Sequence, residues 1–562
     1  MVSLSKECAF PVAIAAKAAV IVPPAGLHEW WEALGLPWLS EICNGLGIDI
    51  DSLPDMPTEE DIKALSVMVP PDLHHNVVEV LLSHALVQRS ISSTAGSSQA
   101  PTLMYSASAR AFLCRVLALL SIPYHELLSA ERQFSQQLYD QAQMKDRSEE
   151  LRKEKEHGFG GKWGRIAATA GGVVLGGVAI GLTGGLAAPA LLPLLPFLST
   201  GAAPALIGSL FGIAGGGLTG YRVRRRWAGV QEFDFVEISG PGQGDRNKAL
   251  QQVPAKKVPS LVATLFIPGM QLNSVTESLE STKQCLPLFA EQQQDVYMVS
   301  HSPEVMLTTG RNLQSWVTTS LLTGAGKEVL QRTALNAVVA AITLPVTIYK
   351  ATGLAVDNEY IRGRDKARKA GLLLADILRE KVQGNRPLIL PLHFSKPSFR
   401  YLHLRPHHHL PNSRKLAEHE SKILSSDTAI FISLPLAPSF TEWSRIRKSV
   451  ARRVVNAYCK SDFVLASVAR LHEVLGGGNV GAISGLTPTS EEVSALGIEN
   501  VDLSNVMQGH FDLAEKMPDI VQLETEWDCR LDGPLFHQFC MGSSSSRTFA
   551  QVTRTRKRYK EQ

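Results

Sequence analysis

The sequence has few cysteines and little net charge, and each of these features argues against certain classes of protein. Its seven cysteines in 562 residues lie far apart, include no Cys-x-x-Cys pair and are odd in number. This pattern argues against a zinc ribbon or a disulfide scaffold and indicates a reducing, intracellular setting. The formal net charge is only +3, so the overall composition does not indicate a nucleic-acid partner.

Signs of disorder and of a bound cofactor are also missing. With 44 % hydrophobic and 19 % charged residues, the chain can bury a sizeable core, and its length suits roughly three or four domains. The glycine-rich stretches 240–244 and 476–478 are not followed by the Lys-Ser/Thr pair of a phosphate loop. The run His407–His409 has no carboxylate or cysteine at ligand spacing. We therefore expect neither a cofactor nor a metal ion.

One long stretch has no charged side chain at all. Ile166–Gly220 runs for 55 residues without Asp, Glu, Lys, Arg or His, well beyond the roughly 20 residues that cross a bilayer as a helix. Its glycines recur at four-residue spacing, as in Gly172/Gly176, and this spacing lets two helices pack closely in lipid. Prolines lie in its middle, and basic residues flank both of its ends.

This stretch predicts a hydrophobic hairpin over residues 163–222 that is transmembrane or re-entrant. Because both flanks are basic, we expect both on the cytoplasmic side of an intracellular membrane. The alternative is a Gly/Ala-rich hairpin that is buried in the protein or lies on a membrane surface.

Helices are predicted before this hairpin. Residues 1–130 show a helical N-terminal region, with amphipathic stretches such as Asn76–Gln88 and Ser108–Leu120. The apolar run Ala9–Val22 is interrupted by Lys17, which favours a buried first helix over a secretory signal. Residues 131–160 are rich in opposite charges three or four positions apart and predict a charged helix or a short coiled coil. At the other end, the basic tail 541–562 is expected to be disordered.

Residues 228–525 alternate between apolar runs and helical stretches, which is typical of an α/β domain. A helical connection at Thr276–Gln294 and helices at Val329–Leu344 and Arg364–Val382 separate short apolar runs that favour strands. This alternation predicts a parallel sheet covered by helices on both faces. The predicted strands are Leu261–Ile267, Val296–Val299, Pro387–Phe394, Ala429–Leu434 and Val454–Tyr458.

Two candidate catalytic residues follow strands in the order that an α/β-hydrolase requires. Asp462 comes shortly after Val454–Tyr458, where a carboxylate can orient an imidazole. His510 follows the segment Ile498–Ser504, in a loop position suited to a general base. Each residue taken alone is more often structural, so these positions carry weight only together with the rest of the chain.

Several motifs, in order, resemble one family over roughly Glu131 to Glu524. They are Gly184-Gly-Leu-Ala-Ala-Pro189, Asp357-Asn358, Arg364-Asp-Lys-Ala-Arg-Lys-Ala-Gly371, Gly384-Asn-Arg-Pro387, Val455-Asn-Ala-Tyr458 and Gly497-Ile-Glu-Asn-Val-Asp-Leu-Ser504 followed by Gly509-His510. Together they resemble the transmembrane and coiled-coil domain-containing protein 4 family, whose members resemble membrane-associated α/β-hydrolases and whose fungal relatives are regarded as lipase-like. The resemblance implies Asp462 as the acid, His510 as the base and Pro268-Gly269-Met270 as the oxyanion loop.

The nucleophile is where this sequence departs from that family. The resemblance implies a Gly-x-Ser-x-Gly elbow after the strand that begins near Pro387, and Ser395 lies near the expected place. His393 and Pro397 occupy the two glycine positions, and the following residues 399–414 do not resemble the expected helix. Three interpretations stay open. They are a divergent protein that has lost hydrolysis, a frame or splice error within residues 388–428, and an active enzyme that uses Ser395 in an unusual turn.

These features together predict a membrane-associated serine hydrolase, a lipase or esterase that acts on lipid or acyl esters. Ser395, Asp462 and His510 are its expected catalytic residues, the hydrolase-like domain faces the cytosol, and membrane lipids are its expected partners. The alternative is a non-catalytic membrane protein that keeps the fold as a scaffold or trafficking component.

Overall fold

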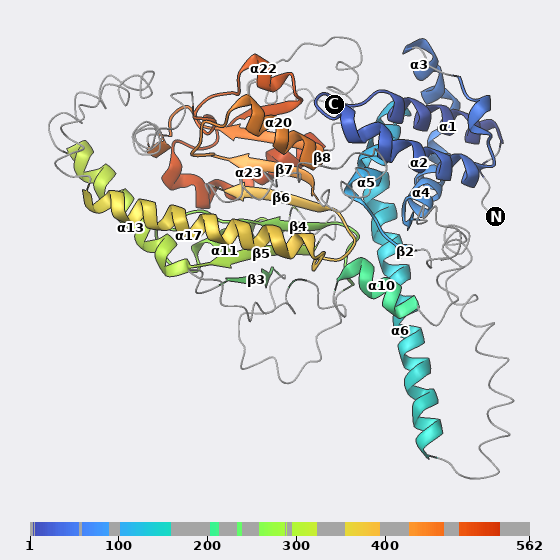
Figure 1. Ribbon diagram of the computed structural model, residues 1–562, viewed down its shortest axis with the longest axis horizontal. Coiled ribbons are helices and arrows are strands. Elements are labelled where there is room, and N and C mark those ends of the chain that lie inside the picture. Colours follow the sequence, from blue (N-terminus) through green and yellow to red (C-terminus); the bar gives the residue numbers. More distant parts are fainter. Residues whose placement is uncertain are drawn as a thin grey trace, which may run out of the picture.

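The computed structural model describes the residues that build a sheet and the helices around it. These are residues 4, 6–54, 59–88, 102–158, 203–212, 218, 233–238, 258–286, 288, 295–322, 354–393, 426–462, 464–465 and 483–528. The predicted helix Val329–Leu344 and the tail 541–562 lie outside these ranges. Figure 1 shows two parts side by side, an N-terminal helical region and a sheet with its covering helices.

The sheet has seven strands in the spatial order β3-β5-β4-β6-β7-β8-β9. The edge strand β3 is antiparallel to β5, and all the other neighbours are parallel. The predicted α/β fold with a parallel sheet is therefore confirmed, together with the helical region before it. The strands are β3 (Phe233–Glu237), β4 (Ala263–Phe266), β5 (Asp295–His301), β6 (Leu388–His393), β7 (Ser426–Ile432), β8 (Val450–Tyr458) and β9 (Ile498–Asp502).

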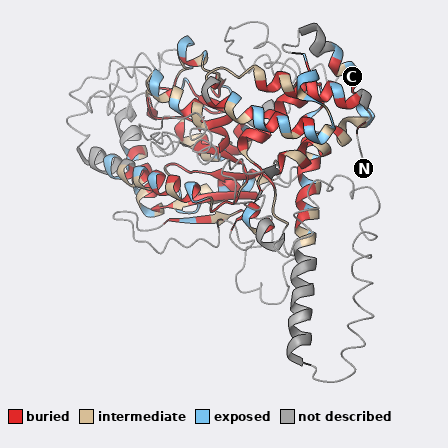
Figure 2. Ribbon diagram, turned by 45° about the vertical axis from the view of Figure 1, so that its right-hand side comes forward, coloured by how far each residue is buried: buried red, intermediate tan, exposed pale blue. Residues whose placement is uncertain are grey.

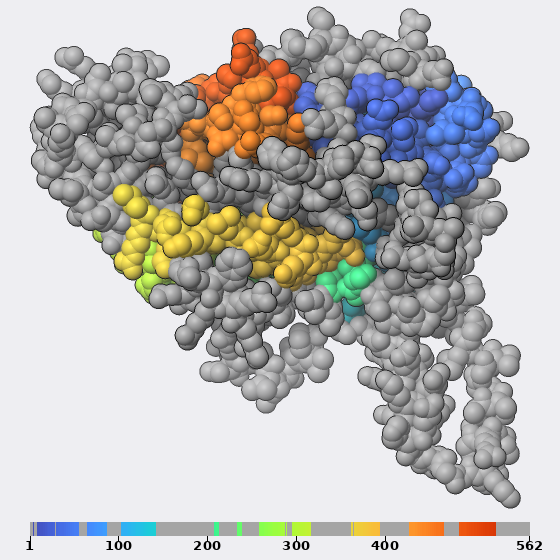
Figure 3. Space-filling model, in the orientation of Figure 1, coloured from blue at the N-terminus to red at the C-terminus, as the bar shows by residue number. Residues whose placement is uncertain are grey.

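Helices cover both faces of this sheet, as the continuous apolar strands require. On one face, α17 (Leu354–Arg379) and α20 (Phe440–Ser449) share a core with the sheet that includes Leu374 and Trp443. On the other face, α23 (Leu513–Asp528) buries Ile520 against the alternate strand residues. Figure 2 shows this burial along the strands, and Figure 3 shows α17 lying along the surface of the molecule. Three further helices are α11 (Glu277–Gln284), α13 (Pro303–Leu322) and α22 (Glu491–Ser494).

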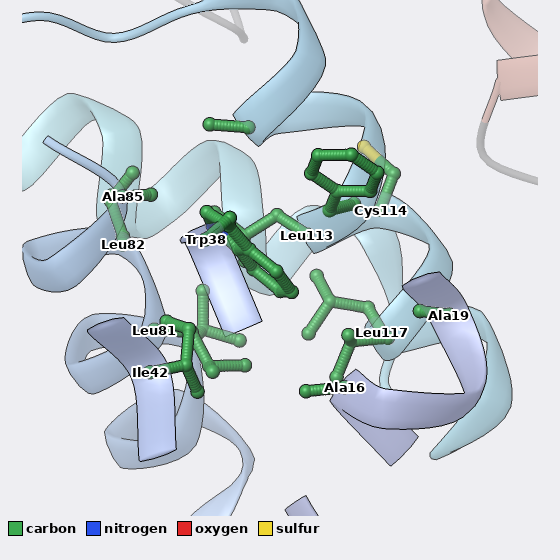
Figure 4. Packing of buried hydrophobic residues seen from close by; sticks show 14 of the residues in the cluster. Ala16, Ala19, Trp38, Ile42, Leu81, Leu82, Ala85, Leu113, Cys114 and Leu117 are labelled. Atoms are coloured by element: carbon green, nitrogen blue, oxygen red, sulfur yellow. The ribbon is translucent and has the colours of Figure 1, made fainter. Parts of the chain in front are cut away.

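The helical region has an apolar core of its own. Its helices are α1 (Lys6–Ile21), α2 (His28–Leu46), α3 (Glu59–Met68), α4 (His74–Ala85), α5 (Ala107–Leu119) and α6 (Tyr124–Gly158), with a two-stranded ribbon of β1 (Val87–Gln88) and β2 (Thr102–Leu103). Figure 4 shows Trp38 of α2 among side chains from α1, α4 and α5. The apolar run at residues 9–22 accordingly forms a helix whose side chains are mostly buried.

This region packs against the amino end of the sheet. Leu261, Val262, Ile389 and Ala451 belong to the same core as the N-terminal helices. In addition, the buried Arg110 of α5 donates hydrogen bonds to Glu131 of α6 at 2.8 Å and to Asp427 of β7 at 3.1 Å. The two parts therefore share one interior.

Helix α6 is 35 residues long, which corresponds to about 52 Å, and it extends away from the body (Figure 1). The only described helix of the predicted hairpin is α10 (Ala203–Phe211), which contacts α6 and β2 and buries Leu210 and Phe211. Residues 163–202 of the hairpin lie outside the described ranges. None of the helices that the structure describes is both long enough and apolar enough to span a bilayer.

Candidate active site

The carboxyl ends of β6, β8 and β9 meet at one edge of the sheet, because the three strands are parallel. Asp462 lies four residues after the end of β8. His510 begins the short 3-10 helix His510–Asp512, which leads into α23. The fold therefore brings together Asp462 and His510, which are 48 positions apart in the sequence.

Asp462 and His510 form a buried pair. The His510 Nδ1 atom lies 3.2 Å from Asp462 Oδ2, and the two residues are 6 % and 0 % exposed. The other carboxylate oxygen, Oδ1, accepts the Leu465 N–H at 3.1 Å. A carboxylate that accepts from Nδ1–H fixes the imidazole tautomer, so that Nε2 is the nitrogen able to take a proton.

The loop that carries His510 is tied back to the end of β8. The Leu503 N–H donates to the Tyr458 carbonyl at 2.8 Å. The buried Cys459 thiol donates to the Met507 carbonyl at 3.5 Å, and burial raises the pKa of this thiol. These contacts fix the approach of His510 to Asp462.

His393, the last residue of β6, lies against His510. The centres of the two imidazole rings are 5.9 Å apart, and the His393 N–H donates to the Ile267 carbonyl at 2.9 Å. Burial and the neighbouring His510 lower the pKa of His393 to about 3, so this ring is neutral at pH 7. The sequence marked His393 only as the residue at a glycine position of the elbow. Its position at a strand end was the signal that it would face the site.

Ser395 lies outside the described residues, as do residues 399–414. It follows His393 by two positions. The catalytic roles of Ser395, Asp462 and His510 stay predictions.

Two further serines follow strands at the same edge and were not singled out from the sequence. Ser302 follows β5 with a φ of 42°, and Ser433 follows β7 with a φ of 51°. Positive φ values are uncommon for a residue with a side chain and often mark functional sites. Both hydroxyls are buried, and neither has a hydrogen-bond partner in the part of the chain that is described.

Comparison with known proteins places the chain in a family. The family described as "Protein of unknown function (DUF726)" matches residues 161–525. The chain belongs to this family. Its range includes all seven strands, the Asp462–His510 pair and the predicted hairpin. No solved structure matches the chain.

Curated relatives carry membrane and lipase names. A transmembrane and coiled-coil domain-containing protein, STS1 of Oryza sativa subsp. japonica, is 25 % identical over 62 % of this chain and 50 % of its own length. An uncharacterized membrane protein of Caenorhabditis elegans is 26 % identical over 58 % of this chain and 47 % of its own. Probable lipase MIL1 of Saccharomyces cerevisiae is 27 % identical over 41 % and 20 %. The predicted family resemblance is confirmed, and this chain spans about half or less of the length of these relatives.

Proposed function

We propose that this chain is a membrane-associated serine hydrolase that cleaves lipid or acyl esters. The observation that carries the proposal is the buried hydrogen bond between His510 and Asp462 at the carboxyl edge of a parallel sheet. The name of the yeast relative, probable lipase, supports the same class of reaction.

In the proposed reaction, the Ser395 hydroxyl oxygen attacks the ester carbonyl carbon while His510 Nε2 takes the hydroxyl proton. The tetrahedral intermediate then collapses, and the leaving alcohol departs with the proton from His510. Water hydrolyses the acyl-serine in the same way, with His510 again as the base, and releases a carboxylic acid. Asp462 accepts the Nδ1–H of His510 throughout and stabilises the imidazolium.

Attachment to a membrane completes the proposal. Relatives are named as membrane proteins, and the uncharged stretch 166–220 is the segment suited to insertion as a two-pass or re-entrant hairpin. The flanking basic residues favour a cytosolic hydrolase domain. Alkaline carbonate extraction of cell membranes tests insertion, since an inserted chain stays in the pellet and release into the supernatant contradicts it.

A fluorophosphonate probe tests the chemistry in the full-length protein. Asp462→Asn is expected to slow labelling by about 10³- to 10⁴-fold, and His510→Ala and Ser395→Ala to abolish it. Asp376→Asn and His125→Ala are matched controls, because both residues are exposed and lie on helices away from the pair. Mass spectrometry of the labelled peptide distinguishes Ser395 from Ser302 and Ser433.

The missing glycines of the nucleophile elbow support a second candidate function. Proline at position 397 and histidine at 393 replace the glycines of a nucleophile elbow. If the transcript encodes this sequence and the protein does not react with the fluorophosphonate probe, the protein is a non-catalytic membrane protein with a hydrolase-like fold. A transcript that restores Gly-x-Ser-x-Gly between Gly384 and Ala429 favours the enzyme.

A further inference from the structure

The loop that follows β4 is held at its tip by two helices. Arg311 of α13 donates to the carbonyls of Leu272 at 3.1 Å and Asn273 at 2.6 Å. Glu277 of α11 accepts the N–H groups of the same two residues, that of Asn273 at 2.9 Å. Both sides of the loop backbone are therefore bound at this point.

Close packing holds the middle of the loop. A Cβ atom on Gly310 of α13 would lie 2.0 Å from the carbonyl oxygen of Gln271. Only glycine permits an approach this close. The Gln271 N–H also donates to the Met306 carbonyl of α13 at 3.4 Å, and Gln271 is buried.

The loop starts at Pro268, next to the end of β5. Burial lowers the pKa of His301 at that strand end, and the carbonyl of Pro268 lies near enough to this histidine to oppose the lowering in part. The preceding residue, Ile267, accepts the N–H of His393, so the loop starts beside the residue that contacts His510.

Between these anchors lie two backbone donors, the N–H groups of Gly269 and Met270. Neither donates to an acceptor among the described residues, and Gly269 is buried. Buried N–H groups are almost always paired in folded proteins. Two backbone N–H groups without acceptors on a fixed loop can stabilise a developing oxyanion, since the loop need not reorganise when the charge forms.

We propose that Gly310 and Arg311 of α13 are positioning residues, which hold the Gly269 and Met270 N–H groups in place to bind the oxyanion of the reaction. The proposal rests on the hydrolase function proposed above. It goes beyond that function because residues of helix α13, which do not react themselves, are given an effect on the rate of the acyl-transfer step.

Two variants of the full-length protein test this assignment. Gly310→Ala forces the loop away from α13, and Arg311→Met removes both hydrogen bonds to its tip. Gly208→Ala is the matched control for the first, because in the described part of the chain a Cβ there has no neighbour within 4 Å outside its own helix backbone. Arg379→Met is the control for the second, because among the described residues Arg379 pairs with Asp376 of its own helix and with no residue of the loop.

Hydrogen exchange is the first readout. The amides of Gln271, Leu272 and Asn273 are expected to exchange about 10-fold faster in Gly310→Ala and in Arg311→Met, with the His393 amide unchanged. Unchanged exchange in both variants overturns the view that Gly310 and Arg311 hold the loop.

The second readout is the fluorophosphonate reaction, separated into probe affinity and maximal labelling rate. The maximal rate is expected to fall by about 10²-fold in Gly310→Ala, with the affinity and the pH midpoint unchanged, and Arg311→Lys should recover part of the loss in Arg311→Met. A labelling rate that does not respond to the faster loop exchange overturns the oxyanion role. A wild-type chain that does not label overturns the hydrolase proposal itself, which is a different result.

Discussion

Replacing Arg110 by methionine removes the guanidinium that joins the helical region to the sheet while keeping a side chain of similar length. Arg110 is fully buried. Its contacts with Glu131 and Asp427 cross between α5, α6 and β7. Because the charges of both carboxylates are buried, the loss of Arg110 affects each part of the molecule.

The two carboxylates are left with unequal partners. Asp427 keeps Arg452, whose Nη2 lies 2.9 Å away. Glu131 keeps the hydroxyl of Tyr105 at 2.7 Å, a neutral donor. Removing one partner of a buried pair typically costs about 3–5 kcal/mol. At about 2–4 °C per kcal/mol for a domain of 150–250 residues, this corresponds to a fall in Tm of roughly 6–20 °C.

Thermal unfolding followed by hydrogen exchange measures this effect separately in α5 and in β7. We expect both elements to lose protection together in Arg110→Met. The surface pair Arg379–Asp376 provides the control, and Arg379→Met should change stability by less than about 1 kcal/mol. Loss of protection in α5 alone, with β7 unchanged, would refute the view that the two parts share one folding unit.

Three other perturbations have defined outcomes. Burial lowers the pKa of His301 to about 4. As the pH falls below about 6.5, the unfolded chain binds a proton on this residue before the folded chain does. His301 therefore lowers the free energy of unfolding by about 2 kcal/mol at pH 5. Denaturant unfolding at pH 7.5 and pH 5 should show that loss diminished in His301→Gln and unchanged in His125→Gln. Gly384→Ala should destabilise the protein by at least about 1–3 kcal/mol, because Gly384 has a φ of +89° and its Cβ would lie 2.2 Å from the Leu210 carbonyl; Gly208→Ala is the control in the same melting assay. Burial raises the pKa of Cys43 to about 11 and those of Cys114 and Cys285 to about 12, so at pH 8 iodoacetamide should modify these thiols only after unfolding, as counted by mass spectrometry.

The central strands could be located from the sequence because each is a continuous apolar run between turn residues. The predicted strand Pro387–Phe394 is β6 to within one residue at each end. Strand β3, Phe233–Glu237, was missed because Asp234 and Glu237 interrupt a short segment that pairs only at the sheet edge.

The pair of Asp462 and His510 was predictable, because residues after parallel strands gather at one edge. Contacts that depend on how separate elements pack were not. Arg110 and Asp427 are 317 positions apart, and no local pattern links them. Likewise, nothing in the text around Gly310 indicates that its missing side chain makes room for the Gln271 carbonyl.

The shared interior has a consequence for where the protein can be divided. The family match begins at residue 161, after the helices that cover Val262, Ile389 and Ala451. A fragment cut at that boundary would carry the whole sheet yet present these side chains, and the Asp427 carboxylate without Arg110, to water. The unit defined by sequence similarity is therefore smaller than the unit that folds, and recombinant expression needs to start at the N-terminal helices.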